Sequence, residues 1–399
     1  MFSSRIVQIT GTGLVMMLLL WGCMESTPPP TSNRREKKPF DNIALLAALP
    51  TEVPVPADNP QTPEKIALGK LLFYDPILSG KKDVACATCH HPDFNFSDGQ
   101  EISLGTNARG LGTERKFNPA NDIPFVKRNS QTVLNTAFNG ITINQSPDAK
   151  TAPMFWDLRV SSLEKQSLEP IKALEEMRGR VYPEDKALET VVERLKKIPA
   201  YQEQFKKAFQ TADAITIENL GKAIASYERT LISNNSRFDQ YMRGDKKAIS
   251  GFELDGLKAF LKSGCAQCHN GPMFSDFKVH TLGVPDNEKL GFSDSGTNQH
   301  YAFRTASLRN LGYTYPYMHS GKFGTLERVL EFYEDLAGRK IGNKNVPDHY
   351  IDPLIKNLSV DFKDISLIVA FLNTLNDPQF DKVIPASVPS GLKVGGEIK

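Results

Sequence analysis

Cys86-Ala87-Thr88-Cys89-His90 and Cys265-Ala266-Gln267-Cys268-His269 place the same pattern, C-x-x-C-H, at two points of a 399-residue chain. The chain has 5 cysteines, and the two motifs use all of them but Cys23. Paired thiols followed directly by a histidine are the attachment signature of haem c, in which the thiols bond to the haem and the histidine binds the iron. We therefore predict two covalently bound haem c groups, with His90 and His269 as iron ligands.

Two other kinds of protein site also use C-x-x-C pairs, and each is an alternative to haem c. A structural zinc site could take all four cysteines, but it would have no need of the two histidines that follow them. A redox-active C-x-x-C is expected inside a thioredoxin-like βαβ pattern, which the sequence lacks. Both alternatives explain less of the sequence than haem c does.

The composition is that of an ordinary globular protein. The 48 Lys and Arg residues nearly balance the 46 Asp and Glu residues, so the charge gives no support for nucleic-acid or polybasic membrane binding. With 40% hydrophobic residues, most of the chain is not disordered, and five cysteines are too few for a disulfide scaffold. The length favours two or three domains.

The N-terminus predicts export. Arg5 precedes an apolar run at 14–20, which is followed by Trp21-Gly22-Cys23 and is too short to span a bilayer. The ending Leu-x-Gly-Cys resembles a lipobox, which makes residues 1–22 a lipoprotein signal peptide and Cys23 the lipid anchor. An ordinary signal cut nearby is the alternative. Met24 favours the outer membrane, residues 23–45 read as a flexible tether, and the protein should face the periplasm.

Helical signals surround both motifs. Thr62-Pro63 is an N-cap followed by proline, and Ser250 with Glu253 forms a capping box. Two apolar stripes at helical spacing read as core: Ile217, Leu220, Ile224, Tyr227 and Leu231, then Ile365, Ile368, Leu372 and Leu375. We predict a mainly α fold with two cytochrome c-like domains, 46–240 and 241–385, each a helix followed by C-x-x-C-H.

Further motifs resemble those of the bacterial dihaem cytochrome c peroxidases and MauG enzymes, in the same order, from about residue 60 to about 378. They are Arg128-Asn129-x-x-Thr132-Val133-Leu134-Asn135, Phe155-Trp156-Asp157-x-Arg159, Leu163-Glu164-x-Gln166 with Pro170 and Glu176-Met177, Phe303-Arg304-x-x-Ser307-Leu308-Arg309-Asn310, and Tyr317-Met318-His319-Ser320-Gly321.

The resemblance assigns roles at the first haem, which in this family reacts with peroxide. Glu176 matches the distal glutamate that moves a proton between the peroxide oxygens, and Gln166 matches the distal glutamine. Without the resemblance, Glu176 would read as a solvated helix charge. Trp156 matches the tryptophan between the two haems, although a lone tryptophan is more often core packing.

The sixth ligand of the second haem distinguishes the peroxidases from MauG. Typical peroxidases carry a methionine fourteen residues after the histidine of the last motif, and here that position is Tyr333, the MauG-like ligand. Packing on an apolar helix face is the alternative for Tyr333. Typical peroxidases also block the first iron with a second histidine, but no histidine lies between His91 and His269.

The family also binds one calcium ion between its domains. Asn129 matches the side-chain ligand, and Thr314 and Pro316 match the positions that donate backbone carbonyls, an all-oxygen set that suits Ca²⁺.

Three functions follow from the resemblance. The first is a peroxidase that reduces H2O2 to water at the first haem, with electrons relayed through the second haem from a small cytochrome c or cupredoxin. The second is a MauG-like enzyme that oxidises protein residues through high-valent haems, which Tyr333 favours. Ser263, where MauG has a tryptophan, speaks against it. The third is a non-catalytic dihaem electron carrier. The resemblance leaves a homodimer open and gives no nucleic-acid partner.

Overall fold

The computed structural model describes residues 42–398. The predicted signal peptide, the lipid anchor at Cys23 and most of the predicted tether lie outside the described residues. Within residues 42–398 the fold is mainly helical, as predicted, and none of its helices is long and apolar enough to cross a membrane. The α-helices are α1 (Pro63–Tyr74), α2 (Cys86–Cys89), α3 (Leu163–Gln166), α4 (Glu169–Lys172), α5 (Ala187–Lys196), α6 (Pro199–Phe209), α7 (Ile217–Glu228), α8 (Arg237–Met242), α9 (Gly251–Lys262), α10 (Leu326–Ala337) and α11 (Ile365–Asn373).

Sheet structure is limited to three antiparallel pairs of two-residue strands in the described part of the chain. They pair β1 (Ala108–Arg109) with β2 (Lys116–Phe117), β3 (Pro153–Met154) with β4 (Val160–Ser161), and β5 (Val279–His280) with β6 (Phe303–Arg304). The β3–β4 turn contains Trp156, so the few strands present serve mainly to hold loops in place.

The predicted helix starts are confirmed. The Thr62 hydroxyl accepts a hydrogen bond from the Lys65 backbone N–H at 3.3 Å, with Pro63 at the first helical position. Ser250 and Glu253 form the capping box, in which the Ser250 N–H donates to the Glu253 carboxylate at 2.8 Å. These local bonds satisfy N–H groups that a helix start otherwise leaves unpaired.

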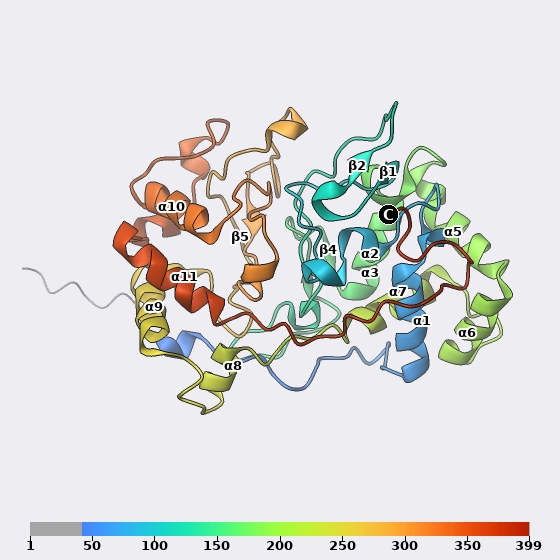
Figure 1. The fold of residues 1–399 in the computed structure, drawn as a ribbon, viewed down its shortest axis with the longest axis horizontal. Helices are drawn as coiled ribbons and strands as arrows, with labels where there is room; N and C mark the ends of the chain where they lie inside the picture. Colours follow the sequence, from blue (N-terminus) through green and yellow to red (C-terminus); the bar gives the residue numbers. More distant parts are fainter. Residues whose placement is uncertain (1–41, 399) are drawn as a thin grey trace, which may run out of the picture. The chain divides into compact units, whose positions relative to one another are not determined.

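One helix crossing occurs twice. Helix α1 packs against α7, and α9 packs against α11, as Figure 1 shows. At each crossing a glycine lets the backbones meet: a Cβ on Gly69 would lie 1.9 Å from the Ala223 carbonyl oxygen, and one on Gly256 would lie 2.0 Å from that of Leu367. The same glycine contact occurs at the α1–α7 and the α9–α11 crossing. The chain therefore contains two copies of one helical module, and each copy carries one C-x-x-C-H motif.

Each module has its own core, and the two predicted apolar stripes lie in different ones. Of the α7 stripe, Leu220, Ile224, Tyr227 and Leu231 are buried in the first core with α1 and α5 residues. The α11 stripe, from Ile365 to Leu375, is buried in the second core with α9 residues. The interpretation of both stripes as core is confirmed.

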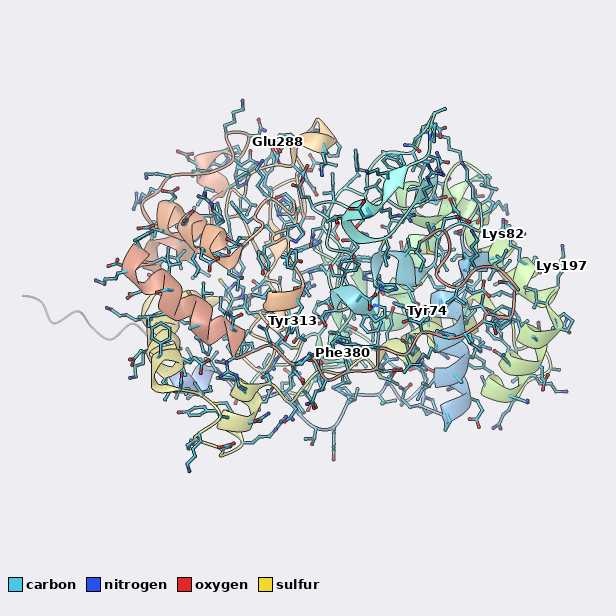
Figure 2. All side chains as sticks on the ribbon, viewed as in Figure 1. Tyr74, Lys82, Lys197, Glu288, Tyr313 and Phe380 are labelled. Carbon is cyan, nitrogen blue, oxygen red and sulfur yellow. The ribbon has the colours of Figure 1, made fainter. Side chains whose placement is uncertain are left out.

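The two ends of the described chain cross between the cores. Leu46 is buried in the second core, although α1 belongs to the first. The dark-red C-terminal segment in Figure 1 runs the other way, from α11 towards α1, and buries Val388 in the first core. Its Gly395 N–H donates to the Tyr74 carbonyl at 2.8 Å, and Phe380 packs on Phe96; Tyr74 and Phe380 are labelled in Figure 2. Terminal segments therefore add to the contiguous domains 46–240 and 241–385 that the sequence predicts.

Candidate active site

The predicted site residues meet at one cavity of about 700 Å³. Its lining includes residues from both C-x-x-C-H motifs, which lie far apart in the sequence. The predicted residues that line it are Cys89, His90, Asn129, Trp156, Gln166, Glu176, Cys265, Cys268, His269, Thr314, Pro316 and Tyr333. Cys86 is the one predicted site residue outside the lining; it packs against the first core at the start of α2.

The first motif forms a helical turn that presents its histidine to the cavity. Cys86 to Cys89 form α2, and the His90 N–H donates to the Cys86 carbonyl at 2.9 Å. His90 Nδ1 lies 3.1 Å from the Phe96 carbonyl oxygen, to which it donates, so the acceptor nitrogen is Nε2. Burial lowers the His90 pKa, which keeps the imidazole neutral. A neutral, oriented imidazole is what an iron ligand requires.

The second motif repeats this arrangement. Cys265 begins the 3₁₀ turn η8 (Cys265–Gln267), and the His269 N–H donates to the Cys265 carbonyl at 2.9 Å. His269 Nδ1 lies 2.9 Å from the Phe274 carbonyl, and burial lowers its pKa as well. All four motif cysteines are free thiols. The donor set therefore fits two haem c groups, with the four thiols available for attachment and both Nε2 atoms for iron.

Glu176 lies in an unusual stretch of backbone. Residues Leu174–Arg178 form a π-helical turn, η6, a conformation that is rare and found disproportionately at functional sites. The turn packs on Gly105, where a Cβ would lie 2.3 Å from the Glu176 carbonyl oxygen. The Thr106 N–H donates to this same carbonyl at 2.8 Å. The backbone at Glu176 is thus fixed, and its side chain lines the cavity.

The Glu176 carboxyl is suited to proton transfer near neutral pH. Burial raises its pKa to about 7, with a smaller contribution from the neighbouring Glu175 charge, while Arg159 acts in the opposite direction. Both protonation states are therefore populated at neutral pH, which is the condition for an efficient acid/base group. Gln166, the last residue of α3, lines the same cavity.

Trp156 lies where the two modules meet. Its indole N–H donates to the Asn129 carbonyl at 3.0 Å, and its ring contacts that of His319 edge-on at 6.4 Å between centroids. Its own carbonyl accepts from the Arg304 N–H at 2.6 Å. Phe155 before it has a φ of 63°, so the turn is held in the left-handed region by these contacts.

Ionic contacts reinforce this junction. Arg128 pairs with Asp157 at 2.7 Å and with Asp294 at 2.5 Å, which joins the first module to the loop before β6. Phe303 stacks on His319 with their centroids 3.5 Å apart. The sequence motifs contain Arg128, Asp157, Phe303 and His319, but not Asp294, and they gave these residues no role in joining the modules, because contacts between distant segments leave no local pattern.

Tyr333 lies on α10 beside the second motif. It packs with Phe332 in a small apolar cluster, and its side chain also lines the cavity. Burial raises the pKa of its hydroxyl, with further contributions from Cys268 and Cys265. Among the described residues this hydroxyl has no hydrogen-bond partner, so it is available to a group in the cavity. The packing interpretation and the ligand interpretation are thus compatible.

The three oxygens predicted for calcium are also available. The Asn129 side chain donates through Nδ2 to the Gln100 carbonyl at 2.8 Å, which turns Oδ1 towards other partners. Within residues 42–398, no hydrogen bond reaches Asn129 Oδ1 or the carbonyl oxygens of Thr314 and Pro316. All three residues line the cavity. An amide oxygen and two carbonyl oxygens are a donor set that fits Ca²⁺.

Two acidic groups at the cavity were missed by sequence reasoning: Glu228, which is buried, and Asp352, whose side chain is 18% exposed. Glu228 ends α7, and its only sequence signal was its position on the apolar stripe helix. Asp352 accepts from His280 Nδ1 at 2.6 Å, and His280 Nε2 donates to Asp276 at 3.0 Å. Nothing in the sequence indicates that Asp352 lies beside β5.

Comparisons with known proteins identify the family of this chain. The model of the di-haem cytochrome c peroxidase family matches residues 63–247. The methylamine utilization protein MauG of Methylorubrum extorquens is 36% identical over 342 residues, which cover 84% of this chain and 85% of the relative. The cytochrome c551 peroxidase of Nitrosomonas europaea is 31% identical over 358 residues, 88% of this chain and 91% of the relative.

A solved structure extends the agreement to the fold. A MauG-like protein associated with microbial copper homeostasis superposes with a TM-score of 0.64 at 26% identity, covering 82% of this chain and 95% of that one. Two haem-attachment motifs on one cavity, a mainly helical fold and relatives matched over most of their length lead to the same conclusion: this chain belongs to the dihaem cytochrome c peroxidase and MauG family.

Proposed function

We propose that this chain is a dihaem c peroxidase that reduces H2O2 to two waters at the first motif, with electrons that enter through the second. The observation that carries the proposal is the position of Glu176, a partly buried carboxyl with a pKa raised to about 7, on the cavity that His90 and His269 also line. Haem c supplies iron that binds peroxide and exchanges electrons. Steady-state oxidation of a reduced small cytochrome c by H2O2 tests the proposal, and no peroxide-dependent oxidation would contradict it.

The residues of the chain handle the protons and the geometry. Glu176 accepts a proton from one oxygen of H2O2 and returns it to the oxygen that leaves as water. The Gln166 side chain lines the same cavity, and its amide can donate and accept hydrogen bonds there. His90 is held at a fixed orientation by the Phe96 carbonyl. Trp156 occupies the junction between the modules, where an aromatic ring shortens the path for electrons.

A MauG-like oxidation of a protein substrate is the second candidate. Tyr333 favours it, because a tyrosine oxygen in the cavity is a hard ligand that stabilises oxidised iron. Ser263 argues against it, since this residue is 1% exposed and offers no aromatic ring at the position where MauG has tryptophan. The third candidate is an electron carrier without catalytic activity. It would not explain why Glu176 and Gln166 line the cavity.

Tyr333→Met should raise the reduction potential of the second haem, because a soft thioether favours ferrous iron and a phenolate favours ferric iron. The shift should be a sizeable part of the roughly 0.8 V over which axial ligands set haem potentials. Potentiometric titration with optical detection measures it, and the ferric spectrum should move to a His/Met form. Tyr350→Met, at a tyrosine outside the cavity lining, is the control. Unchanged potential and spectrum would mean that Tyr333 only packs.

We also propose a single Ca²⁺ held by Asn129, Thr314 and Pro316. Because Asn129 also accepts the Trp156 indole hydrogen bond through its carbonyl, loss of the ion should disturb the junction between the modules. Chelation of Ca²⁺ should lower peroxide turnover about tenfold or more, by analogy with loss of a group that orients a site. Added Ca²⁺ should restore it in the wild type but not in Asn129→Ala. Elemental analysis that finds no calcium would contradict the proposal.

A further inference from the structure

Glu228 is a buried acid for which peroxide reduction, as described above, has no use. It is the last residue of α7, 4% exposed, and it lines the cavity. Gly221, Ala225 and Glu228 share one face of α7, and this face packs on α3: a Cβ on Gly221 would lie 2.4 Å from the Glu164 carbonyl oxygen. Glu228 therefore lies on a helix that packs directly against α3, the helix that ends in Gln166.

Within residues 42–398, no cationic side chain forms an ion pair with Glu228. Its neighbour Arg229 donates both terminal nitrogens to the Glu164 carboxylate, at 2.6 and 3.0 Å, so these two charges cancel. Glu164 also accepts from Asn59 Nδ2 at 2.9 Å. Among the described residues, Glu228 Oε2 has no hydrogen-bond partner. A buried carboxylate in this position would be strongly destabilised, and a protonated carboxyl much less so.

Cationic side chains on helices α1 and α5, which pack on α7, have partners other than Glu228. From α1, Lys65 donates to the Pro60 carbonyl at 2.8 Å, and Lys70 pairs with Asp381 at 2.7 Å. From α5, Arg194 donates to the Ser79 carbonyl at 2.6 Å. Burial accordingly raises the pKa of Glu228 to about 8, with Arg229 lowering it and Glu164 raising it.

Glu228 also lies near the first haem-attachment cysteine. Burial raises the pKa of the Cys86 thiol, and the Glu228 carboxylate is the next largest cause of that rise. A charge that affects the Cys86 sulfur must also affect a haem bonded to that sulfur. Conversely, a change of charge on the iron must change the proton affinity of Glu228, because the coupling between two sites is reciprocal.

We propose that Glu228 is a redox-linked proton acceptor of the first haem site. When one electron enters this site at alkaline pH, one proton from solvent adds to the Glu228 carboxylate, and no other bond forms or breaks. When the electron leaves, the proton leaves. The buried site then changes its net charge by less than one unit. The inference rests on the haem c at His90 but not on peroxide reduction, since its test requires no peroxide.

The test is a potentiometric titration of the holoprotein at several pH values from 6 to 10, following the optical and EPR signals of the first haem. Wild type is compared with Glu228→Gln, which keeps the shape and cannot titrate. The matched control is Glu218→Gln, at an exposed glutamate of the same helix that pairs with Lys222. Pyridine haemochrome assays establish two haems per chain in each variant.

The expected result has a definite sign. Near pH 6, well below the Glu228 pKa of about 8, Glu228 is protonated in both redox states, so wild type and Glu228→Gln should keep a constant difference in potential there. Above about pH 8 the wild-type potential should fall relative to Glu228→Gln, tenfold in the equilibrium constant per pH unit, which is 59 mV for one electron. Glu218→Gln should follow wild type. Glu176, which titrates near pH 7, contributes equally to both and cancels in the difference.

Two results would overturn the proposal. One is a wild-type potential that does not change between pH 8 and 10, a measurement that depends on no variant. The other is a Glu228→Gln protein that keeps the wild-type pH dependence. Should Glu228→Gln fail to fold, Glu228→Asp decides: it retains a carboxyl and should keep the pH dependence with a shifted inflection. Activity assays then remain a separate test of the peroxidase itself.

Discussion

Glu176→Gln should lower the rate constant for reaction with H2O2 by about 10²- to 10⁴-fold, the range typical of a positioned acid/base group. Glutamine keeps the size of the side chain and its place in the π-helical turn, but it can neither accept nor return a proton. Both haems should remain attached, because the substitution leaves all four motif cysteines and both histidines in place. Stopped-flow absorbance with increasing H2O2 measures the rate constant.

The pH dependence provides a second readout for Glu176. The accepting form is the carboxylate, and burial raises the pKa of this group to about 7. The wild-type rate constant should therefore rise as the pH increases through about 7, and Glu176→Gln should lack this rise. Glu189→Gln, at a 61% exposed side chain paired with Lys186, should behave as wild type. A Glu176→Gln enzyme with full activity would end the assignment.

His90→Gly and His269→Gly should fail in different ways. Each removes the imidazole Nε2 that the structure presents to the cavity while leaving the thiols for attachment. His90→Gly should abolish the reaction with H2O2. His269→Gly should still consume peroxide in a first, single turnover, but steady-state turnover with a reduced donor should drop to background. Each variant is the control for the other.

The reverse pattern would show that the roles proposed here for the two haems must be exchanged. If His269→Gly lost the first reaction with peroxide while His90→Gly retained it, peroxide would react at the second motif. Single-turnover and steady-state measurements on the same preparations distinguish the two cases, provided both variants carry two haems.

The two proposed haem-attachment sites could be chosen from the sequence because every part of them is local. In each motif, five consecutive residues form one turn and present the histidine. Helix starts such as Thr62-Pro63 and Ser250 with Glu253 are also local, and the structure confirms them. The apolar stripes of α7 and α11 are periodic over a single helix, so their burial could be predicted as well.

Glu176 could not be chosen from the sequence without the resemblance, because several acids lie between 169 and 184. The structure separates them by environment. Glu169 pairs with Lys172 at 2.6 Å, whereas Glu176 is partly buried on the cavity and its pKa is raised to about 7. Burial and pairing depend on distant segments such as Gly105, which a local pattern does not contain.

Contacts between distant segments explain what the sequence could not predict. The C-terminal segment around Gly395 packs on α1 and α2, where its carbonyl accepts from the Thr88 hydroxyl at 2.8 Å. In the sequence, Glu228 is one position of an amphipathic helix next to Arg229. The structure shows that Arg229 pairs with Glu164 instead, so the neighbouring cation is not a partner for Glu228. The carbonyls of Thr314 and Pro316 carry no side-chain signal at all.

Peroxide reduction at the first motif, supplied with electrons through the second, is tested most directly by mixing the wild-type holoprotein with one equivalent of H2O2 and following both haems by stopped-flow absorbance. The protein should be fully oxidised in one experiment and half-reduced in the other. We expect the first haem to react with peroxide, the second to lose its electron afterwards, and reduced cytochrome c to restore the starting state over many cycles. A long-lived oxidised state that no donor returns would support the MauG-like candidate instead, and two haems that do not react with H2O2 would contradict the peroxidase.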